Sequence, residues 1–128
     1  ALGRGRPLPR PLCRGAGLMP PRRKLVAFRG PQTETFASIT WDEANRAEHE
    51  ARRPSPRFEA TLHADWSRVF KRKDAEHPGP PDRFQALVGR DLGVAYAVYF
   101  VVFTKIDGHM KVITIRYSND AERQVFFR

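Results

Sequence analysis

The sequence is almost without cysteine: among its 128 residues there is one, Cys13. A single thiol excludes an intrachain disulfide framework and a cysteine-based metal site in this chain. The four histidines and the carboxylates show no spacing typical of metal ligands either, so we expect neither a metal nor another cofactor. The low cysteine content favours a reducing, cytoplasmic setting.

Long hydrophobic runs are also missing. A bilayer-spanning helix takes about 20 apolar residues, and the longest apolar run here, Val94 to Phe103, has the length of a strand. The arginine-rich start has the charge of an organelle-targeting peptide, but Pro7, Pro9 and Pro11 would break the amphipathic helix of such peptides. The sequence therefore predicts no membrane segment.

Acidic residues are absent from the first 33 positions, which hold eight basic side chains. The formal net charge is +9, so the rest of the chain is nearly neutral, with 15 basic against 14 acidic residues. Because the start is rich in Pro, Gly and Arg, we expect residues 1–37 to be a disordered tail, with the part before Met19 as a possible upstream extension. Residues 38–128 are long enough for one domain with a modest core.

Two helices are predicted after a short β-prone run at residues 38–41. Residues 42–53 carry acids in the first turn and arginines in the last, as the helix dipole favours. Asp42 is the expected N-cap, and Pro54 ends the helix. A second helix is expected at residues 57–64, with Phe58 and Leu62 on one face.

Four strands and a closing helix follow. Residues 65–73 alternate aromatic and basic side chains and are typical of an edge strand. Further strands are expected at residues 83–90, 95–105 and 111–117, with Asp107-Gly108 as a hairpin turn before the last. Residues 98–103 are apolar on both faces, which indicates a central strand covered on both sides. Asn119 or Asp120 is expected to cap a helix at residues 121–127.

The predicted fold is α+β in the order β-α-α-β-β-β-β-α. Its sheet is expected to be mostly antiparallel, with four to five strands and helices packed on one face.

Six short motifs occur along the domain in a fixed order. They are Ile39-Thr40-Trp41-Asp42-Glu43-Ala44, Arg57-Phe58-Glu59-Ala60, Arg83-Phe84-Gln85-Ala86-Leu87-Val88-Gly89, Val101-Val102-Phe103-Thr104, Val112-Ile113-Thr114-Ile115-Arg116 and Ala121-Glu122-Arg123. With this order and spacing, residues 38–127 resemble BrnT-type toxins, which are small ribonucleases of bacterial type II toxin–antitoxin systems with a RelE-like fold.

The resemblance implies a cytoplasmic endoribonuclease that cleaves RNA without a metal and inhibits translation. It also implies a partner, a BrnA-type antitoxin that holds the toxin inactive in a hetero-oligomer, and contact with DNA only through that antitoxin. One departure is clear, because Arg52-Arg53-Pro54 stands where family members commonly have Lys-His-Gly. The imidazole expected at position 53 is therefore missing.

Such cleavage needs the 2′-OH to attack the adjacent phosphate, while the site stabilises charge on the phosphate oxygens and moves two protons. With the resemblance, Arg83 and Arg116 are the candidates for phosphate binding, since a guanidinium stays charged and grips two oxygens at once. For proton transfer the candidates are His49, Arg53 and Glu122. His63 and His109 also remain open, because an imidazole exchanges protons near neutral pH.

RNA binding is expected from basic residues near these positions. The candidates are Arg52, Lys71, Arg72, Lys73 and Arg123, with Trp66, Phe70 or Phe84 as stacking rings. Each candidate also has an ordinary alternative. The aromatic rings would belong to the core, the histidines would lie on the surface, and the charged side chains would form solvated ion pairs.

Two further functions fit the sequence. An inactive homologue would serve as a protein-interaction module, as the missing imidazole at Arg53 allows. A basic nucleic-acid-binding protein would act mainly through residues 1–33, and its affinity would fall with salt.

Overall fold

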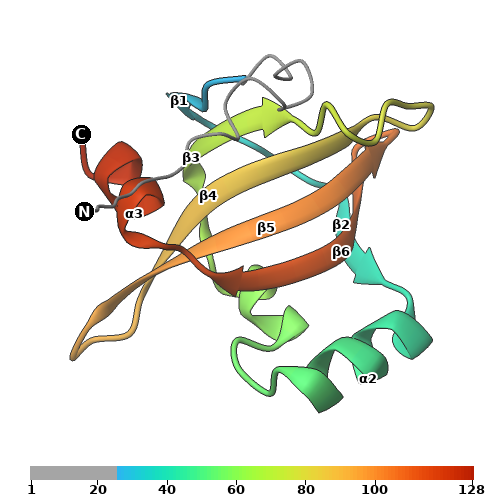
Figure 1. Ribbon diagram of the computed structural model, residues 1–128, viewed down its shortest axis with the longest axis horizontal. Coiled ribbons are helices and arrows are strands. Elements are labelled where there is room, and N and C mark those ends of the chain that lie inside the picture. Colours follow the sequence, from blue (N-terminus) through green and yellow to red (C-terminus); the bar gives the residue numbers. More distant parts are fainter. Residues whose placement is uncertain (1–25) are drawn as a thin grey trace, which may run out of the picture.

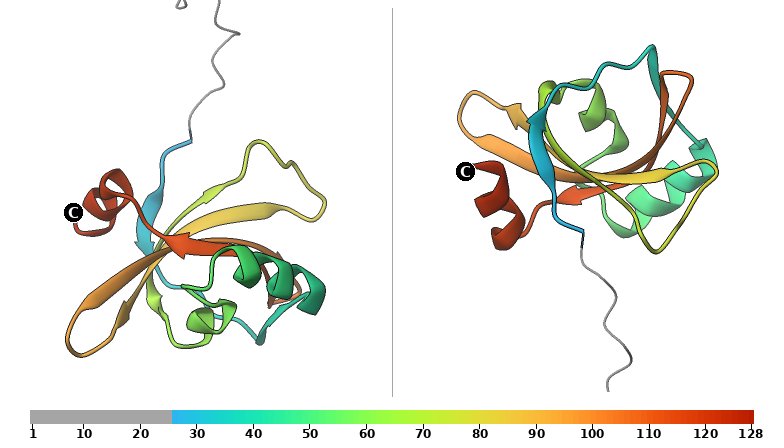
Figure 2. Two further views of the ribbon diagram at one scale, coloured as in Figure 1. Left: turned by 60° about the horizontal axis from the view of Figure 1, so that its bottom comes forward. Right: turned by 90° about the horizontal axis from the view of Figure 1, so that it is seen from above.

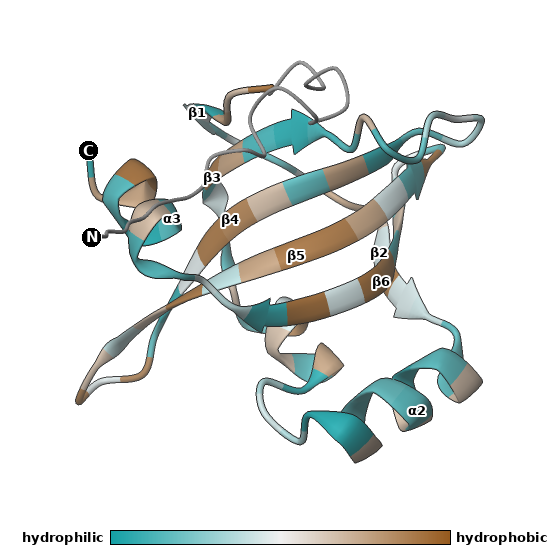
Figure 3. Ribbon diagram, in the orientation of Figure 1, coloured by the Kyte–Doolittle hydropathy of each residue, from teal (hydrophilic) through white to brown (hydrophobic). Residues whose placement is uncertain are grey.

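The fold is organised around β5 (Tyr96–Ile106), the strand predicted to be central. The computed structural model describes residues 26–128, so Cys13, Met19 and the predicted disorder of residues 1–25 lie outside the described part. Eight of the 11 residues of β5 are buried. Figure 3 shows that the strand is apolar along most of its length, and successive side chains point to opposite faces. Both faces of the sheet therefore need cover.

Six strands form one mixed sheet in the order β1-β3-β4-β5-β6-β2 (Figure 1). Besides β5 they are β1 (Arg29–Gln32), β2 (Ser38–Trp41), β3 (Asp65–Lys73), β4 (Arg83–Asp91) and β6 (His109–Tyr117). β4 pairs antiparallel with β3 and β5, and β5 pairs antiparallel with β6. Asp107 and Gly108 both have positive φ in the turn from β5 to β6. That geometry suits the twist of a two-residue hairpin and confirms the predicted turn.

The edges of the sheet differ from the prediction of four to five mostly antiparallel strands. β2 lies parallel to β6 at one edge. At the other edge, β1 comes from residues predicted to belong to the tail and pairs antiparallel with β3. β3 is therefore an inner strand and not the edge strand that was predicted. Alternating side chains tell which residues share a face, but they do not tell which strand lies alongside.

The helices do not share one face, so that prediction is wrong. α2 (Glu43–Arg52) starts at the predicted cap, since the Asp42 side chain accepts a hydrogen bond from the Asn45 N–H. The second predicted helix is a short 3-10 helix, η1 (Phe58–Leu62). α3 (Asp120–Phe126) begins after Asn119, which is the cap, and not Asp120, the other candidate. Within residues 26–128, no helix has the length and apolar character to cross a membrane.

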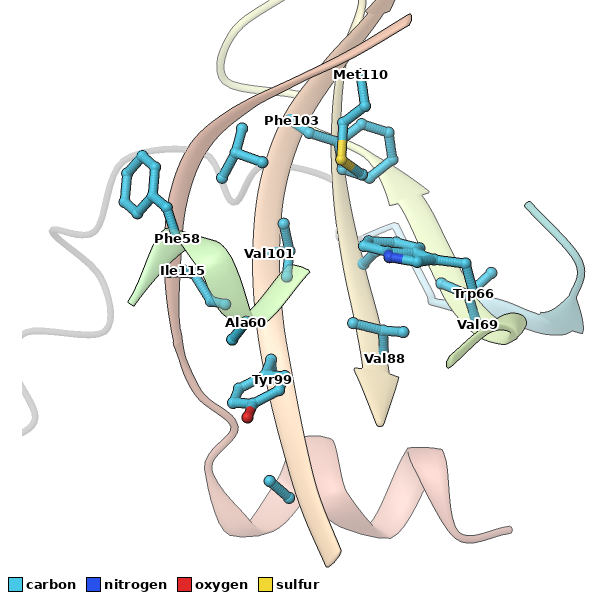
Figure 4. Close-up of a cluster of buried hydrophobic side chains, with 13 residues drawn as sticks. Phe58, Ala60, Trp66, Val69, Val88, Tyr99, Val101, Phe103, Met110 and Ile115 are labelled. Atoms are coloured by element: carbon cyan, nitrogen blue, oxygen red, sulfur yellow. The ribbon is translucent and has the colours of Figure 1, made fainter. Parts of the chain in front are cut away.

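Two cores lie on the two faces of the sheet. We call the face under η1 the inner face, where the core includes Phe58, Trp66, Val88, Tyr99, Val101, Phe103, Met110 and Ile115 (Figure 4). The opposite, outer face carries a smaller core of Phe70, Leu87, Val98, Phe100, Val102 and Phe126. Phe126 of α3 is 1% exposed. α3 therefore packs on the outer face because β5 is apolar on that side as well.

A short linker joins the two edges of the sheet. Residues 33–37 lead from β1 to β2, which are the first and last strands of the order (Figure 2). The Glu34 N–H donates to the Trp66 carbonyl at 2.8 Å, and the Ala37 N–H donates to the Gly108 carbonyl at 2.7 Å. The Glu34 carboxylate, 8% exposed, binds both Lys71 of β3 and Lys105 of β5. This ion cluster fixes the linker across the sheet.

We expect Glu34→Gln to lower the free energy of unfolding by about 1–3 kcal/mol at neutral pH, because it removes a charged hydrogen-bond acceptor from two lysines. Burial raises the pKa of Glu34, but the hydrogen bonds from Lys71 and Lys105 outweigh it, so the pKa lies below the ordinary 4.5. This stabilisation is complete above pH 4.5 and is lost as the pH falls through the lower, folded-state pKa.

Urea unfolding between pH 7 and pH 3 measures this effect. The difference between the two proteins should shrink below about pH 4.5. The exposed Glu48→Gln serves as a control and should follow the wild type throughout. A constant difference at all pH values would contradict the role of the Glu34 charge.

Candidate active site

The five predicted catalytic residues do not meet at one place. Arg116 and Glu122 lie together on the outer face, and Arg83 lies further along that face. Arg83 stands opposite Thr104 and Arg116 opposite Phe100, four residues apart on β5, or roughly 13 Å. His49 and Arg53 lie elsewhere, on and just after α2.

Arg116 and Glu122 form a closed ion pair. Arg116 Nη1 and Nη2 donate to the two oxygens of Glu122, both at 2.8 Å. Glu122 also accepts from the backbone N–H of Asn119 in a capping box. Burial raises the pKa of Glu122, but these hydrogen bonds outweigh it and leave the pKa below 4.5. The pair therefore anchors α3 to β6, and neither carboxylate oxygen is left for proton transfer.

Arg72 and Arg83 also lie on the outer face. Arg72 follows the same alternation as Phe70, and Arg83 the same as Leu87. Arg72 Nε donates to Gln85 Oε1 at 2.7 Å, and its guanidinium lies 3.9 Å from the ring centre of Phe28. Within residues 26–128, the Arg83 side chain has no hydrogen bond or ion pair. The outer face is therefore basic, with one of its arginines neutralised by Glu122.

The run Lys71-Arg72-Lys73 does not form one basic track. Lys71 lies over the inner-face ring of Phe84 and binds Glu34, and Lys73 pairs with Asp82 at 3.3 Å. Strand alternation places both lysines on the opposite side from Arg72. Arg123, the last predicted RNA-binding residue of the chain, lies over the ring of Phe127 on α3.

With polar side chains, α2 covers the part of the β6 edge that β2 leaves unpaired. Asn45 Nδ2 donates to the Ile113 carbonyl at 2.9 Å, and His49 Nε2 lies 3.0 Å from the Ile115 carbonyl. A carbonyl only accepts, so His49 Nε2 carries the proton and Nδ1 faces the Thr114 hydroxyl at 3.3 Å. His49 is buried, and both of its ring nitrogens are engaged. His49, which lies near Arg52 and Arg53, therefore covers the exposed backbone at the edge of β6.

Two of the other three histidines have a hydrogen-bond partner for a ring nitrogen, and the third has none in the described part of the chain. His109 Nδ1 is 2.7 Å from Ser38 Oγ, and His77 Nδ1 is 3.1 Å from Asp74 Oδ2. His63 is exposed, and its ring makes no hydrogen bond to any residue from 26 to 128. His63 is thus the histidine whose two ring nitrogens are both available.

A polar hollow of about 400 Å³ opens beside His63 on the inner face. The side chains that carry chemistry in it are Arg57, Glu59, His63, Arg90, Tyr99 and Tyr117. Arg57 Nη2 lies 3.3 Å from Glu59 Oε1, and the Tyr117 hydroxyl lies 2.9 Å from Ser55 Oγ. The rings of Tyr99 and Tyr117 are 5.6 Å apart. One hollow therefore holds a carboxylate, an imidazole, two guanidinium groups and two phenols.

Local structure sets the side of η1 that faces this hollow. Phe58 and Thr61 are fully buried, and the Thr61 carbonyl accepts from Trp66 Nε1 at 2.8 Å. These contacts fix the side of η1 that packs against the sheet. Glu59 and His63 lie away from that buried side and remain accessible at the hollow.

Three neighbouring strands supply the floor of the hollow. Tyr99 of β5 stands opposite Tyr117 of β6, and both follow the inner-face alternation. Arg90 follows the alternation of Ala86 and Val88 on β4, so it is a charged residue at the end of an apolar row. The place of Arg90 in this alternating row of core residues is the sequence signal that would have identified it.

Of the hollow's side chains, only His63 was among the residues considered for proton transfer from the sequence. Arg57 and Arg90 are 33 positions apart, and no local motif joins them. Their convergence depends on η1 packing against the sheet, which spacing along the chain does not reveal.

Comparisons of this chain with protein families, with characterised proteins and with solved structures find no match.

Proposed function

We propose that this protein is a metal-independent endoribonuclease whose chemistry takes place in the polar hollow. The observation that carries the proposal is the convergence of Glu59, His63 and two arginines, Arg57 and Arg90, in one accessible cavity. A carboxylate and an imidazole are proton carriers, and a guanidinium group is suited to binding the oxygens of a phosphodiester.

The proposed reaction needs no group from outside the chain and its substrate. A base in the hollow, Glu59 or His63, takes the proton of the 2′-OH, and the 2′-oxygen bonds to phosphorus. The bond from phosphorus to the 5′-oxygen breaks, and the other group, which starts in its protonated form, donates its proton to that oxygen. The products are a 2′,3′-cyclic phosphate and a 5′-hydroxyl. Arg57 and Arg90 stabilise the charge on the phosphate oxygens.

The tyrosines fit the bases of the substrate. Tyr117 is 49% exposed at the rim of the hollow, while Tyr99 is 2% exposed beneath it. An exposed ring stacks on any unpaired base, which favours single-stranded RNA as the substrate.

The toxin–antitoxin setting remains part of the proposal and rests on the resemblance to BrnT-type toxins with their RelE-like fold. A BrnA-type antitoxin would neutralise the enzyme by covering the hollow. Apolar side chains near its rim support this, because Leu62 is 51% and Leu92 is 45% exposed. Burying such side chains is a common source of affinity between proteins.

The test compares the wild type with Arg90→Ala and Arg83→Ala, which remove one arginine from each face of the sheet. We expect Arg90→Ala to lower cleavage of a short single-stranded RNA by about 10²–10³-fold, the loss typical for a group that stabilises the transition state. Arg83→Ala should stay within a few-fold of the wild type. Cleavage is measured with EDTA present, and the products are identified by their terminal phosphates.

If Arg83→Ala instead loses much more cleavage activity than Arg90→Ala, the chemistry takes place on the outer face. If the purified wild type leaves RNA intact and its expression does not slow growth, the protein is instead a non-catalytic interaction module.

A further inference from the structure

A half-buried arginine on the outer face has no carboxylate partner. Arg72 donates from Nε to Gln85 and from Nη1 to the Val26 carbonyl at 3.1 Å. Its Nη2 makes no hydrogen bond to any part of the chain from residue 26 onward, and Arg72 takes part in no ion pair there. Burial lowers the pKa of Arg72, so the charged form has lost hydration. A desolvated charge of this kind is costly until an anion pairs with it.

The nearby acids are already engaged. Both oxygens of Glu122 accept from Arg116, and one also accepts from Asn119. The Asp74 carboxylate accepts from the Glu76 N–H and lies 3.1 Å from His77 Nδ1. Neither acid is within ion-pair distance of Arg72, so Arg72 has no anionic partner within residues 26–128 and remains available to an anion from another molecule.

A cavity of about 410 Å³ opens at this arginine, between the segment before β1 and α3. Phe28 and Val125 give it apolar walls, and Arg128 adds a second cation. Its one carboxylate side chain, Glu122, is already paired with Arg116. This volume is within the range of small-molecule sites, in which a few polar groups orient a mainly apolar contact. The site therefore suits a ligand with one anionic group and one flat, apolar part.

We propose that this cavity binds a nucleotide, with its phosphate on Arg72 and Arg128 and its base against Phe28 and Val125. The choice of a nucleotide rests on the proposed function, whereas the need for an anion rests on Arg72 alone. The cavity lies on the outer face and the polar hollow on the inner face, so the two sites are separate. The nucleotide is either free or the phosphorylated end of a strand.

The test measures binding of adenosine 3′-monophosphate to the full chain by calorimetry, beside adenosine and inorganic phosphate. We expect the nucleotide to bind at least ten-fold more tightly than either part. Arg72→Gln should weaken binding by at least ten-fold, since it removes the charge. Ala121→Trp fills the cavity from the exposed start of α3 and should have the same effect while Arg72 is intact.

A deoxy-oligonucleotide with a 3′-phosphate distinguishes the two sources, because it lacks the 2′-OH and cannot be cleaved. Tighter binding of this strand than of the mononucleotide, again lost in Ala121→Trp, identifies a strand end. Equal or weaker binding identifies the free nucleotide. Circular dichroism of both variants confirms that they are folded.

The proposal is overturned if the nucleotide does not bind, if inorganic phosphate binds as tightly, or if both folded variants bind it like the wild type. Arg90→Ala separates this result from the ribonuclease proposal, because it should lower cleavage by about 10²–10³-fold and keep nucleotide binding. A wild type that cleaves no RNA but binds the nucleotide through Arg72 would overturn the ribonuclease and support this site.

Discussion

Replacing His63 with alanine is expected to lower the rate of RNA cleavage by about 10²–10⁴-fold, the usual contribution of a proton-transfer group. His63 follows η1 directly and lines the polar hollow with Glu59 and Arg90. The rings of His49, His77 and His109 are held by Ile115, Asp74 and Ser38. His63 is therefore the histidine placed to exchange a proton with a substrate.

The measurement is kcat/KM against pH for the wild type and His63→Ala. Loss of a group that only binds RNA would lower the whole profile evenly, whereas loss of a proton carrier should also remove one limb of it. His77→Ala is the matched control, because that ring faces Asp74 away from the hollow. A His63→Ala variant with unchanged rate and profile would show that the imidazole takes no part.

The largest loss of stability is expected from Phe58→Ala, at about 3–5 kcal/mol. Phe58 is fully buried at the start of η1. Its ring centre lies 5.1 Å from that of His49 on α2 and 6.0 Å from that of Trp41 on β2. Removing the ring would leave a cavity where two helical segments and a strand meet, and packing would relax only in part.

Chemical unfolding measures this loss, with Leu62→Ala as the control from the same 3-10 helix. Leu62 is 51% exposed, so its removal should cost less than about 1 kcal/mol. Because Phe58 fixes the inner side of η1, Phe58→Ala should also reduce cleavage through the displaced Glu59 and His63. A fully stable Phe58→Ala variant would mean that η1 does not depend on this core.

Local signals in the sequence were sufficient for most individual elements. Asp42 was predicted as a helix cap, and Asn119 was one of two candidates for the other cap, with Asp120. Asp42 and Asn119 both accept the backbone hydrogen bond that a cap requires. Asp107-Gly108 was predicted as a turn because this pair tolerates two positive φ angles. The apolar residues of β5 predicted a strand buried on both faces, and eight of its residues are buried.

Pairing between distant segments was not predictable in the same way. β1 and β2 are separated by a short linker, yet they lie at opposite edges of the sheet. Nothing in a four-residue strand specifies its neighbour, because backbone hydrogen bonds are the same for every partner. The extra strand and the parallel pair were missed for this reason. The position of α3 was missed because apolar residues on both faces of β5 do not tell which helix covers which face.

The sequence by itself determined the α+β class, the places of α2, α3 and the strands β2 to β6, and which side chains alternate together. The tertiary structure decided which charges remain available for chemistry. It paired Glu122 with Arg116 and engaged both nitrogens of His49 at the edge of β6. It also brought Arg57 and Arg90 into one hollow. A side chain's availability depends on partners that are distant in the chain, and only the packed fold selects those partners.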